Sequence, residues 1–175
     1  MQEQVQRRLE IDKYERTYLI LALVMIGVFF AAVVAGALIL NVHTPDSGEF
    51  VNPLTLGQES FTELGLFDRG NNNYDVYALA QMWQFNLGPN TEIVANHQVL
   101  RIPLGARVTF HVASRDINHG FFIQYNNINL QLVPGHIARQ SVLFDRPGNF
   151  WVVCHEYCGR GHQQMGFMIS VEEGA

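Results

Sequence analysis

The order of apolar and polar residues divides the chain into two parts. Residues 18–42 contain no charged side chain over 25 consecutive positions, more than the roughly 20 apolar residues that cross the hydrocarbon core of a bilayer. A cleaved signal sequence has a shorter apolar region, of about 7 to 15 residues. We therefore predict a transmembrane helix over 18–42.

The flanking charges predict how this helix is oriented. Residues 1–17 are charged and lack Gly and Pro, so we expect them to extend the helix on the cytoplasmic side. The first charged residues after it are acidic, Asp46 and Glu49. The basic residues before it are Arg7, Arg8, Lys13 and Arg16. The positive-inside rule then places the N-terminus in the cytoplasm and residues 43–175 outside a plasma (inner) membrane.

From Tyr74 the pattern changes to short runs of β-branched and aromatic residues separated by Pro and Gly. This pattern predicts an all-β domain over 74–175, a sandwich or barrel. The segment 43–73 has scattered Gly, Asp and Asn without a period, and we expect it to be a linker or wrapping segment. The strands that we predict are 74–85, 98–102, 107–113, 119–124, 128–133, 137–144, 149–153 and 166–172.

Composition and charge restrict the partners. Hydrophobic residues make up 48% of the chain, as expected when a soluble domain is averaged with a lipid-buried segment. Residues 43–175 carry twelve Asp or Glu, seven Arg and no Lys. This acidity argues against nucleic acid and is compatible with a basic electron-donor protein.

The candidate chemistry lies in residues 154–165, which contain the only two cysteines, Cys154 and Cys158. Together with His162 and Met165 they form a soft ligand set that selects copper or zinc over magnesium or calcium. A structural zinc site would need a second ligand pair of matched spacing, and Met165 is a poor zinc ligand. A disulfide between the cysteines is the alternative for a protein outside the cytoplasm.

The spacing Cys-x3-Cys-x3-His-x2-Met resembles the ligand loop of the dinuclear copper (CuA) domain in subunit II of cytochrome c oxidase. Three upstream segments resemble the same family: 118–121, 127–135 and 146–150. Its single anchor resembles the B-type haem-copper oxidases. The resemblance implies one N-terminal transmembrane helix followed by a cupredoxin-like Greek-key domain that holds two copper ions.

The resemblance also implies the ligands. Cys154 and Cys158 are expected to bridge the two coppers, and His119 and His162 are expected to bind one copper each. Met165 is expected to be a weak axial ligand, and Glu156 is expected to contribute its backbone carbonyl. His155 is expected to hydrogen-bond around the site instead of binding metal. Met168 could compete with Met165, but we expect it to pack in the core.

Two further roles follow from the resemblance. The family accepts electrons through an aromatic run on an early strand, which predicts Trp83 and Phe85 as electron-input residues; Gln81 stands where the family has a first Trp. Glu15 resembles the residue at the mouth of a proton-uptake path. In the family members with two anchors, the glutamate that corresponds to Glu156 binds a further, non-redox metal together with an Asp from the segment that corresponds to 127–135. No Asp lies in 127–135 of this chain, so Glu156 is not expected to hold that metal.

These features predict subunit II of a terminal haem-copper oxidase. It would accept electrons from an external cytochrome c or small copper protein and pass them to haem in subunit I, where O2 is reduced to water and protons are translocated. We expect no bond-making active site in this chain, since nothing near the ligands resembles a general base beside a substrate pocket. The alternatives are the CuA subunit of a nitric or nitrous oxide reductase and a membrane-anchored copper carrier.

Overall fold

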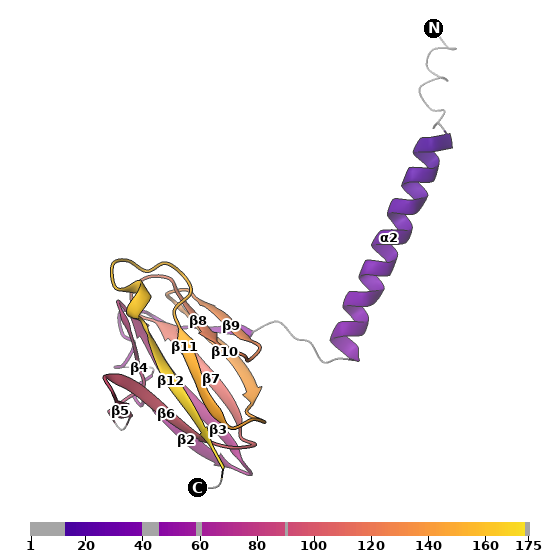
Figure 1. The fold of residues 1–175 in the computed structure, drawn as a ribbon. Helices are drawn as coiled ribbons and strands as arrows, with labels where there is room; N and C mark the ends of the chain where they lie inside the picture. Colours follow the sequence, from indigo (N-terminus) through magenta and orange to yellow (C-terminus); the bar gives the residue numbers. More distant parts are fainter. Residues whose placement is uncertain (1–12, 40–45, 59–60, 90, 174–175) are drawn as a thin grey trace. The chain divides into compact units, whose positions relative to one another are not determined.

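The computed structural model describes residues 13–39, 46–58, 61–89 and 91–173. They belong to two compact units, one before Pro45 and one from Pro45 onward, and each is described by itself. The first is helical and the second is a β domain (Figure 1).

The helical unit contains α2, Lys13–Leu38, with 26 residues. At 1.5 Å per residue it is about 39 Å long, enough to span a hydrocarbon core of about 30 Å. None of its residues is buried within the structure, so its apolar side chains are free to face lipid. The helix begins inside the charged segment that we expected to extend it, while the expected helical residues 1–12 and 40–42 lie outside the described part of the chain.

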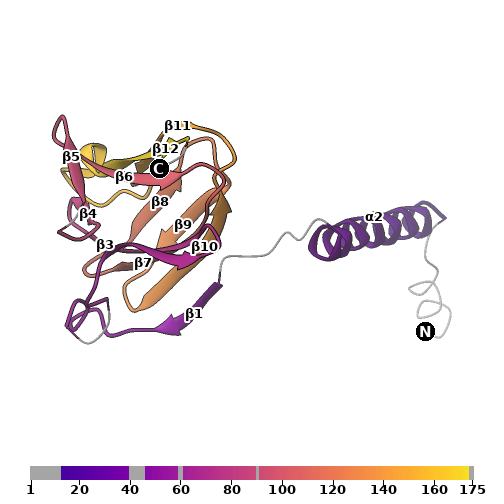
Figure 2. The same cartoon turned by 90° about the horizontal axis from the view of Figure 1, so that it is seen from below.

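The β domain consists of two six-stranded sheets. Figure 2 shows β6 and β12 of the second sheet lying over β3 and β7 of the first. The first sheet has the order β1 (Asp46–Phe50), β10 (His136–Leu143), β7 (Arg107–Ser114), β3 (Asn73–Gln81) and β2 (Gly65–Gly70), with β4 (Gln84–Asn86) also paired to β3. The second has the order β5 (Glu92–Val94), β6 (His97–Pro103), β12 (Gly166–Glu172), β11 (Gly148–Val153), β8 (His119–Ile123) and β9 (Ile128–Leu132).

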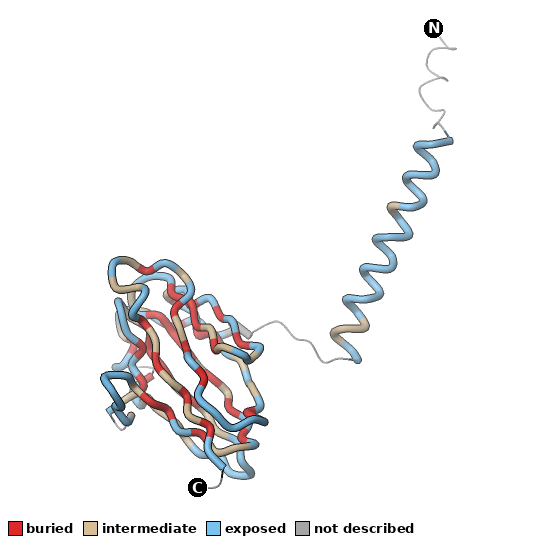
Figure 3. The backbone as a smooth tube through the Cα atoms, in the orientation of Figure 1, coloured by how far each residue is buried: buried red, intermediate tan, exposed pale blue. Residues whose placement is uncertain are grey.

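Buried residues alternate with exposed ones along many of the strands (Figure 3), and the buried ones form the main core between the two sheets. On β12, for example, Phe167, Ile169 and Val171 point inward. Aromatic rings fill the centre: Phe85 lies 5.6 Å, centroid to centroid, from both Phe121 and Phe167. This packing confirms the β sandwich that the short β-branched and aromatic runs predict.

The start of the β domain differs from the expected boundary. β1 and β2 lie within 43–73 and are hydrogen-bonded to β10 and β3. Between these strands the chain covers the outer face of the first sheet, where Val51, Leu56 and Phe61 form a second apolar cluster with Leu79, Ala113 and Ile137. The described part of 51–64 therefore wraps the sheet, and the two strands were missed because they contain Gly and Asp and lack alternation.

One predicted strand is divided in the structure. The expected strand 74–85 ends at Gln81, and β4 begins at Gln84 and pairs back with β3. Met82 and Trp83 form the turn between them, and both side chains are exposed. The turn places Trp83 at the surface, whereas the next apolar residue, Phe85, returns to the core with 1% of its surface exposed.

Candidate metal centre

The predicted ligands meet at one end of the sandwich. The loop between β11 and β12, orange to yellow at the top of the domain in Figure 1, carries five of them, and His119 begins β8. The loop is closed by a 3.0 Å hydrogen bond from the Cys154 N–H to the Met165 carbonyl. Gly159 adopts a φ of 109°, which favours glycine, and thereby turns the chain into the short helix His162–Gln164.

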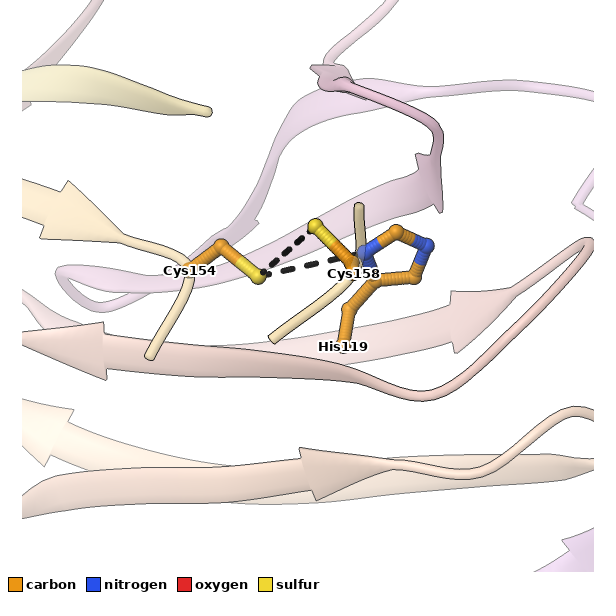
Figure 4. Close-up of side chains that lie close together, drawn as sticks. All are labelled: His119, Cys154 and Cys158. Atoms are coloured by element: carbon orange, nitrogen blue, oxygen red, sulfur yellow. Dashed lines mark hydrogen bonds between the residues drawn. The ribbon is translucent and has the colours of Figure 1, made fainter. Parts of the chain in front are cut away.

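The two cysteines and His119 form the centre of the site (Figure 4). The Cys154 Sγ lies 3.7 Å from the Cys158 Sγ and 3.8 Å from the His119 Nδ1. One ligand atom from each residue lies within 4.8 Å of the other two, and all three residues are buried. Both cysteines are free thiols, because a disulfide would bring the sulfurs to about 2.05 Å. The disulfide alternative is therefore not what the structure contains.

The other predicted ligand atoms surround the same sulfurs. The carbonyl oxygen of Glu156 lies 3.3 Å from the Cys154 Sγ. The His162 Nδ1 lies 3.5 Å, and the Met165 Sδ 3.7 Å, from the Cys158 Sγ. The structure thus brings all six predicted residues to one place.

Burial shields the thiol of Cys158 from water. Burial, followed by the neighbouring Cys154, raises the pKa of Cys158 to about 12. The Gly120 N–H points at the Cys154 Sγ from 3.5 Å. A thiolate pair at this position needs a compensating cation, so these residues suit a soft metal ion that displaces the thiol protons as it binds.

Trp83 lies directly against the ligand loop. Its indole Nε1 donates a 2.9 Å hydrogen bond to the Cys158 carbonyl. A Cβ at Gly161 would lie 2.6 Å from the Trp83 ring, so the absence of a side chain at residue 161 allows this contact. Trp83 is 42% exposed and therefore joins the surface to the site.

Phe85 does not share that position. It is buried between Phe121 and Phe167, and a protein that docks at the surface cannot touch it. Of the two predicted electron-input residues, Trp83 alone therefore lies where a docking protein could touch it.

Several other residues also have defined places. His155 is exposed and makes no hydrogen bond within the described residues; its Nε2 lies 3.9 Å from the Glu156 carboxylate. Its ring packs on Gly120, where a Cβ would lie 2.2 Å from the Nδ1.

Met168 was expected in the core, but it is half-buried on the outer face opposite Trp151, because Phe167 and Ile169 take the inward positions. Glu15 lies in the first turn of α2.

Asp116 was not among the predicted site residues. Its Oδ1 lies 2.8 Å from the His119 Nε2, the ring nitrogen that faces away from the cysteines. Burial alone would raise the pKa of Asp116, but hydrogen bonds from the Met82 N–H, His119 and the Ile117 N–H lower it overall. The spacing Asp-x2-His could have indicated from the sequence that Asp116 lies close to His119. The contact between Asp116 and Met82 joins residues 34 positions apart and could not be predicted from the sequence.

Known proteins resemble this chain in sequence and fold. Residues 54–172 match the family model described as cytochrome c oxidase subunit II, periplasmic domain. A cytochrome c oxidase subunit 2 from one strain of Thermus thermophilus is 34% identical over 168 residues, covering 91% of this chain and 92% of the relative. A second cytochrome c oxidase subunit 2 from Thermus thermophilus is 35% identical over 128 residues, covering 71% of this chain and 87% of the relative.

A solved structure agrees with the sequence relatives. A chain in a haem-copper terminal oxidase dimer superposes with a TM-score of 0.73 at 32% identity, covering 91% of this chain and 100% of that chain. The predicted architecture, one N-terminal apolar helix followed by a cupredoxin-like β domain, is confirmed. On the family match, the two relatives and the shared fold, this chain belongs to the cytochrome c oxidase subunit II family.

Proposed function

We propose that this chain, as subunit II of a haem-copper oxidase, holds a dinuclear CuA centre and relays electrons from an external donor protein to haem in subunit I. The observation that supports this most directly is the convergence of four predicted ligand atoms on the two cysteine sulfurs, at 3.3 to 3.8 Å. A copper-binding subunit of the oxidase is what membership of the family implies.

The donor set fits copper. Thiolate and thioether sulfur are soft donors, imidazole suits copper, and a weak axial Met is typical of electron-transfer copper sites. A single copper would need only one Cys, so the presence of a second buried Cys favours a site that would hold two coppers. The proposed ligands are Cys154, Cys158, His119, His162, Met165 and the carbonyl of Glu156.

When bound, a dinuclear copper centre supplies a redox couple that takes up and releases one electron with little change in its bonds. The residues of this chain keep that geometry fixed. His119 begins β8, which is hydrogen-bonded to β11 on one side and to β9 on the other. The ligand loop is closed by the hydrogen bond between the Cys154 N–H and the Met165 carbonyl. Burial of Cys158 and Met165, with 0% and 2% exposed, excludes water from the sulfurs.

We propose that Trp83 receives electrons from the donor, a cytochrome c or small copper protein. Within the described residues, it is the aromatic side chain that combines exposure at the surface with a hydrogen bond to the ligand loop. This hydrogen bond, continued by the covalent bonds of Cys158 from its carbonyl to its Sγ, gives a short path from the indole to a proposed ligand atom.

The membrane arrangement is also part of the proposal. α2 anchors the chain with its N-terminus in the cytoplasm and the β domain on the periplasmic side, as the flanking basic residues favour. Glu15 then lies at the cytoplasmic end of the helix, where it would begin a proton-uptake path. Electrons that reach subunit I would reduce O2 to water with translocation of protons.

The alternative functions are less well supported. A copper carrier has to release its ion, and such proteins favour exposed sulfur ligands, whereas both cysteines here are buried. A nitric or nitrous oxide reductase would use the same ligands, but the relatives that cover most of this chain are cytochrome c oxidase subunits.

The isolated complex tests the proposal. The full chain, purified from membranes in mild detergent, should bring with it a haem-containing partner that consumes O2 when a reduced donor is added. The Cys158→Ser variant should retain the partner and its haem but lose donor-driven O2 consumption. A chain that purifies without haem and exchanges copper freely with a chelator would contradict the relay and support the carrier.

A further inference from the structure

Asp116, in the turn between β7 and β8, accepts hydrogen bonds from three directions. The Ile117 N–H donates to its Oδ1 and the Met82 N–H to its Oδ2, both at 2.7 Å. The third neighbour is the His119 Nε2, 2.8 Å from the Oδ1. Because both oxygens already accept from backbone donors, the contact with His119 is satisfied when the ring nitrogen carries the proton.

This contact determines which nitrogen of His119 is free. A neutral imidazole carries one proton, so a proton on the Nε2 leaves the Nδ1 with an unshared electron pair. That Nδ1 lies 3.8 Å from the Cys154 Sγ, on the side of the other ligand atoms. The ring is fully buried, so water cannot take over the role of the carboxylate.

We infer that Asp116 is the positioning residue of the copper site: its carboxylate holds His119 in the Nε2–H tautomer and aims the Nδ1 at the metal. The inference rests on the proposed function, since it assigns His119 to copper. Outer-shell carboxylates of this kind typically change metal affinity about 10- to 100-fold when they are removed.

The Asp116 carboxylate also connects His119 with the loop that carries the cysteines. Through the Met82 N–H it holds the turn between β3 and β4, and the next residue, Trp83, hydrogen-bonds the carbonyl of Cys158. The turn is thus tied to His119 on one side and to the cysteine loop on the other. Asn at this position could not replace Asp, because its single acceptor oxygen cannot serve Met82 and His119 together, and its NH2 would face a donor.

The tautomer can be measured on the full chain in detergent micelles before any copper is added. With 15N-labelled histidine, the two ring nitrogens of His119 should show a protonated Nε2 and an unprotonated Nδ1; the His119→Gln variant assigns the signals. A proton on the Nδ1 of the wild-type chain would overturn the inference, and this result does not depend on any variant being folded.

The Asp116→Asn variant then tests the consequence. It should populate both tautomers, lose copper to a competing chelator about 10- to 100-fold more readily, and change the copper hyperfine splitting. The midpoint potential should rise, because removal of a negative charge favours the reduced centre. Asp75→Asn is the matched control: Asp75 is a hydrogen-bonded carboxylate of similar exposure, 22% against 26%, paired with Arg69 away from the site.

The outcomes separate this inference from the proposed function. If Asp116→Asn leaves the tautomer, copper retention, hyperfine splitting and potential like those of Asp75→Asn, Asp116 does not position the ligand. If the wild-type chain binds no copper pair, the proposed function fails, and the tautomer of His119 still decides whether Asp116 orients the ring. Circular dichroism and the melting temperature identify a variant that is merely misfolded.

Discussion

The indole Nε1 of Trp83 donates a 2.9 Å hydrogen bond to the carbonyl oxygen of Cys158. Through it, a side chain that is 42% exposed touches the backbone of a buried ligand residue. The surface that a donor protein can reach and the proposed copper site are therefore one hydrogen bond apart.

Trp83→Phe should slow electron transfer from the donor without removing copper. Phe keeps an aromatic ring against Gly161 but lacks the N–H, and a net contribution of about 1 kcal/mol to stability is lost with the hydrogen bond. Stopped-flow mixing of the complex with reduced donor measures the rate. Trp151→Phe, at a half-exposed Trp on the second sheet, is the control and should react at the wild-type rate; equal rates for both variants would exclude Trp83 as the input residue.

Gly161→Ala should displace Trp83. The new Cβ would lie 2.6 Å from the Cγ and Cδ2 of the indole ring, closer than atoms approach in folded proteins, so the ring has to move away from the loop. We expect a lower melting temperature and a loss of donor-driven rate at least as large as in Trp83→Phe. Gly27→Ala, where no atom lies within 4 Å of the added Cβ, is the matched control. An unchanged fluorescence spectrum of Trp83 in Gly161→Ala would count against the described contact.

Cys158→Ser should abolish the dinuclear centre, whereas His155→Ala should leave it intact. Cys158 lies within 4 Å of Cys154, His162 and Met165, while His155 points toward Gly120 and the exposed carboxylate of Glu156. The optical spectrum and the copper content of the two variants decide this. Loss of copper from a folded His155→Ala chain would show that the ligand list is wrong.

Stability should fall as the pH drops below about 6.5, in part because of His111. Burial lowers the pKa of His111 below its ordinary value of 6.5, helped by Arg139 and Arg69 and opposed by Asp75. The unfolded chain then binds more protons than the folded one around and below that pH, so acid favours unfolding. His111→Phe keeps the stacking on Tyr77, now at 4.6 Å between ring centroids, and should show a smaller drop in melting temperature between pH 7.5 and pH 5.5. An equal drop in both proteins would assign the effect to other groups.

Much of the fold could be predicted from the sequence because its strands alternate. β12 was predicted with the observed bounds, and its buried residues Phe167, Ile169 and Val171 alternate with the half-buried Met168 and Ser170. The sequence predicted this strand but not the face of the sheet on which Met168 lies. Met is apolar enough to pack in the core or to lie on the outer face. β1 and β2 could not be recognised, as they are short, contain Gly and Asp, and are held by pairing with distant strands.

The candidate site divides in a similar way. Cys154, Cys158, His162 and Met165 are close in sequence, and their spacing in one loop pointed to a metal site. His119 and the carbonyl of Glu156 came only from the family resemblance, since neither residue type is distinctive at its position. Asp116 and the turn at Met82 depend on contacts between β strands that are distant in sequence, and these required the structure.

The dinuclear copper centre is best tested by electron paramagnetic resonance, combined with copper quantification, on the full chain loaded with copper in detergent. We expect two coppers per chain and a spectrum in which one unpaired electron is shared equally by both nuclei. A single-copper spectrum, or a silent chain that has taken up zinc, would contradict the dinuclear relay.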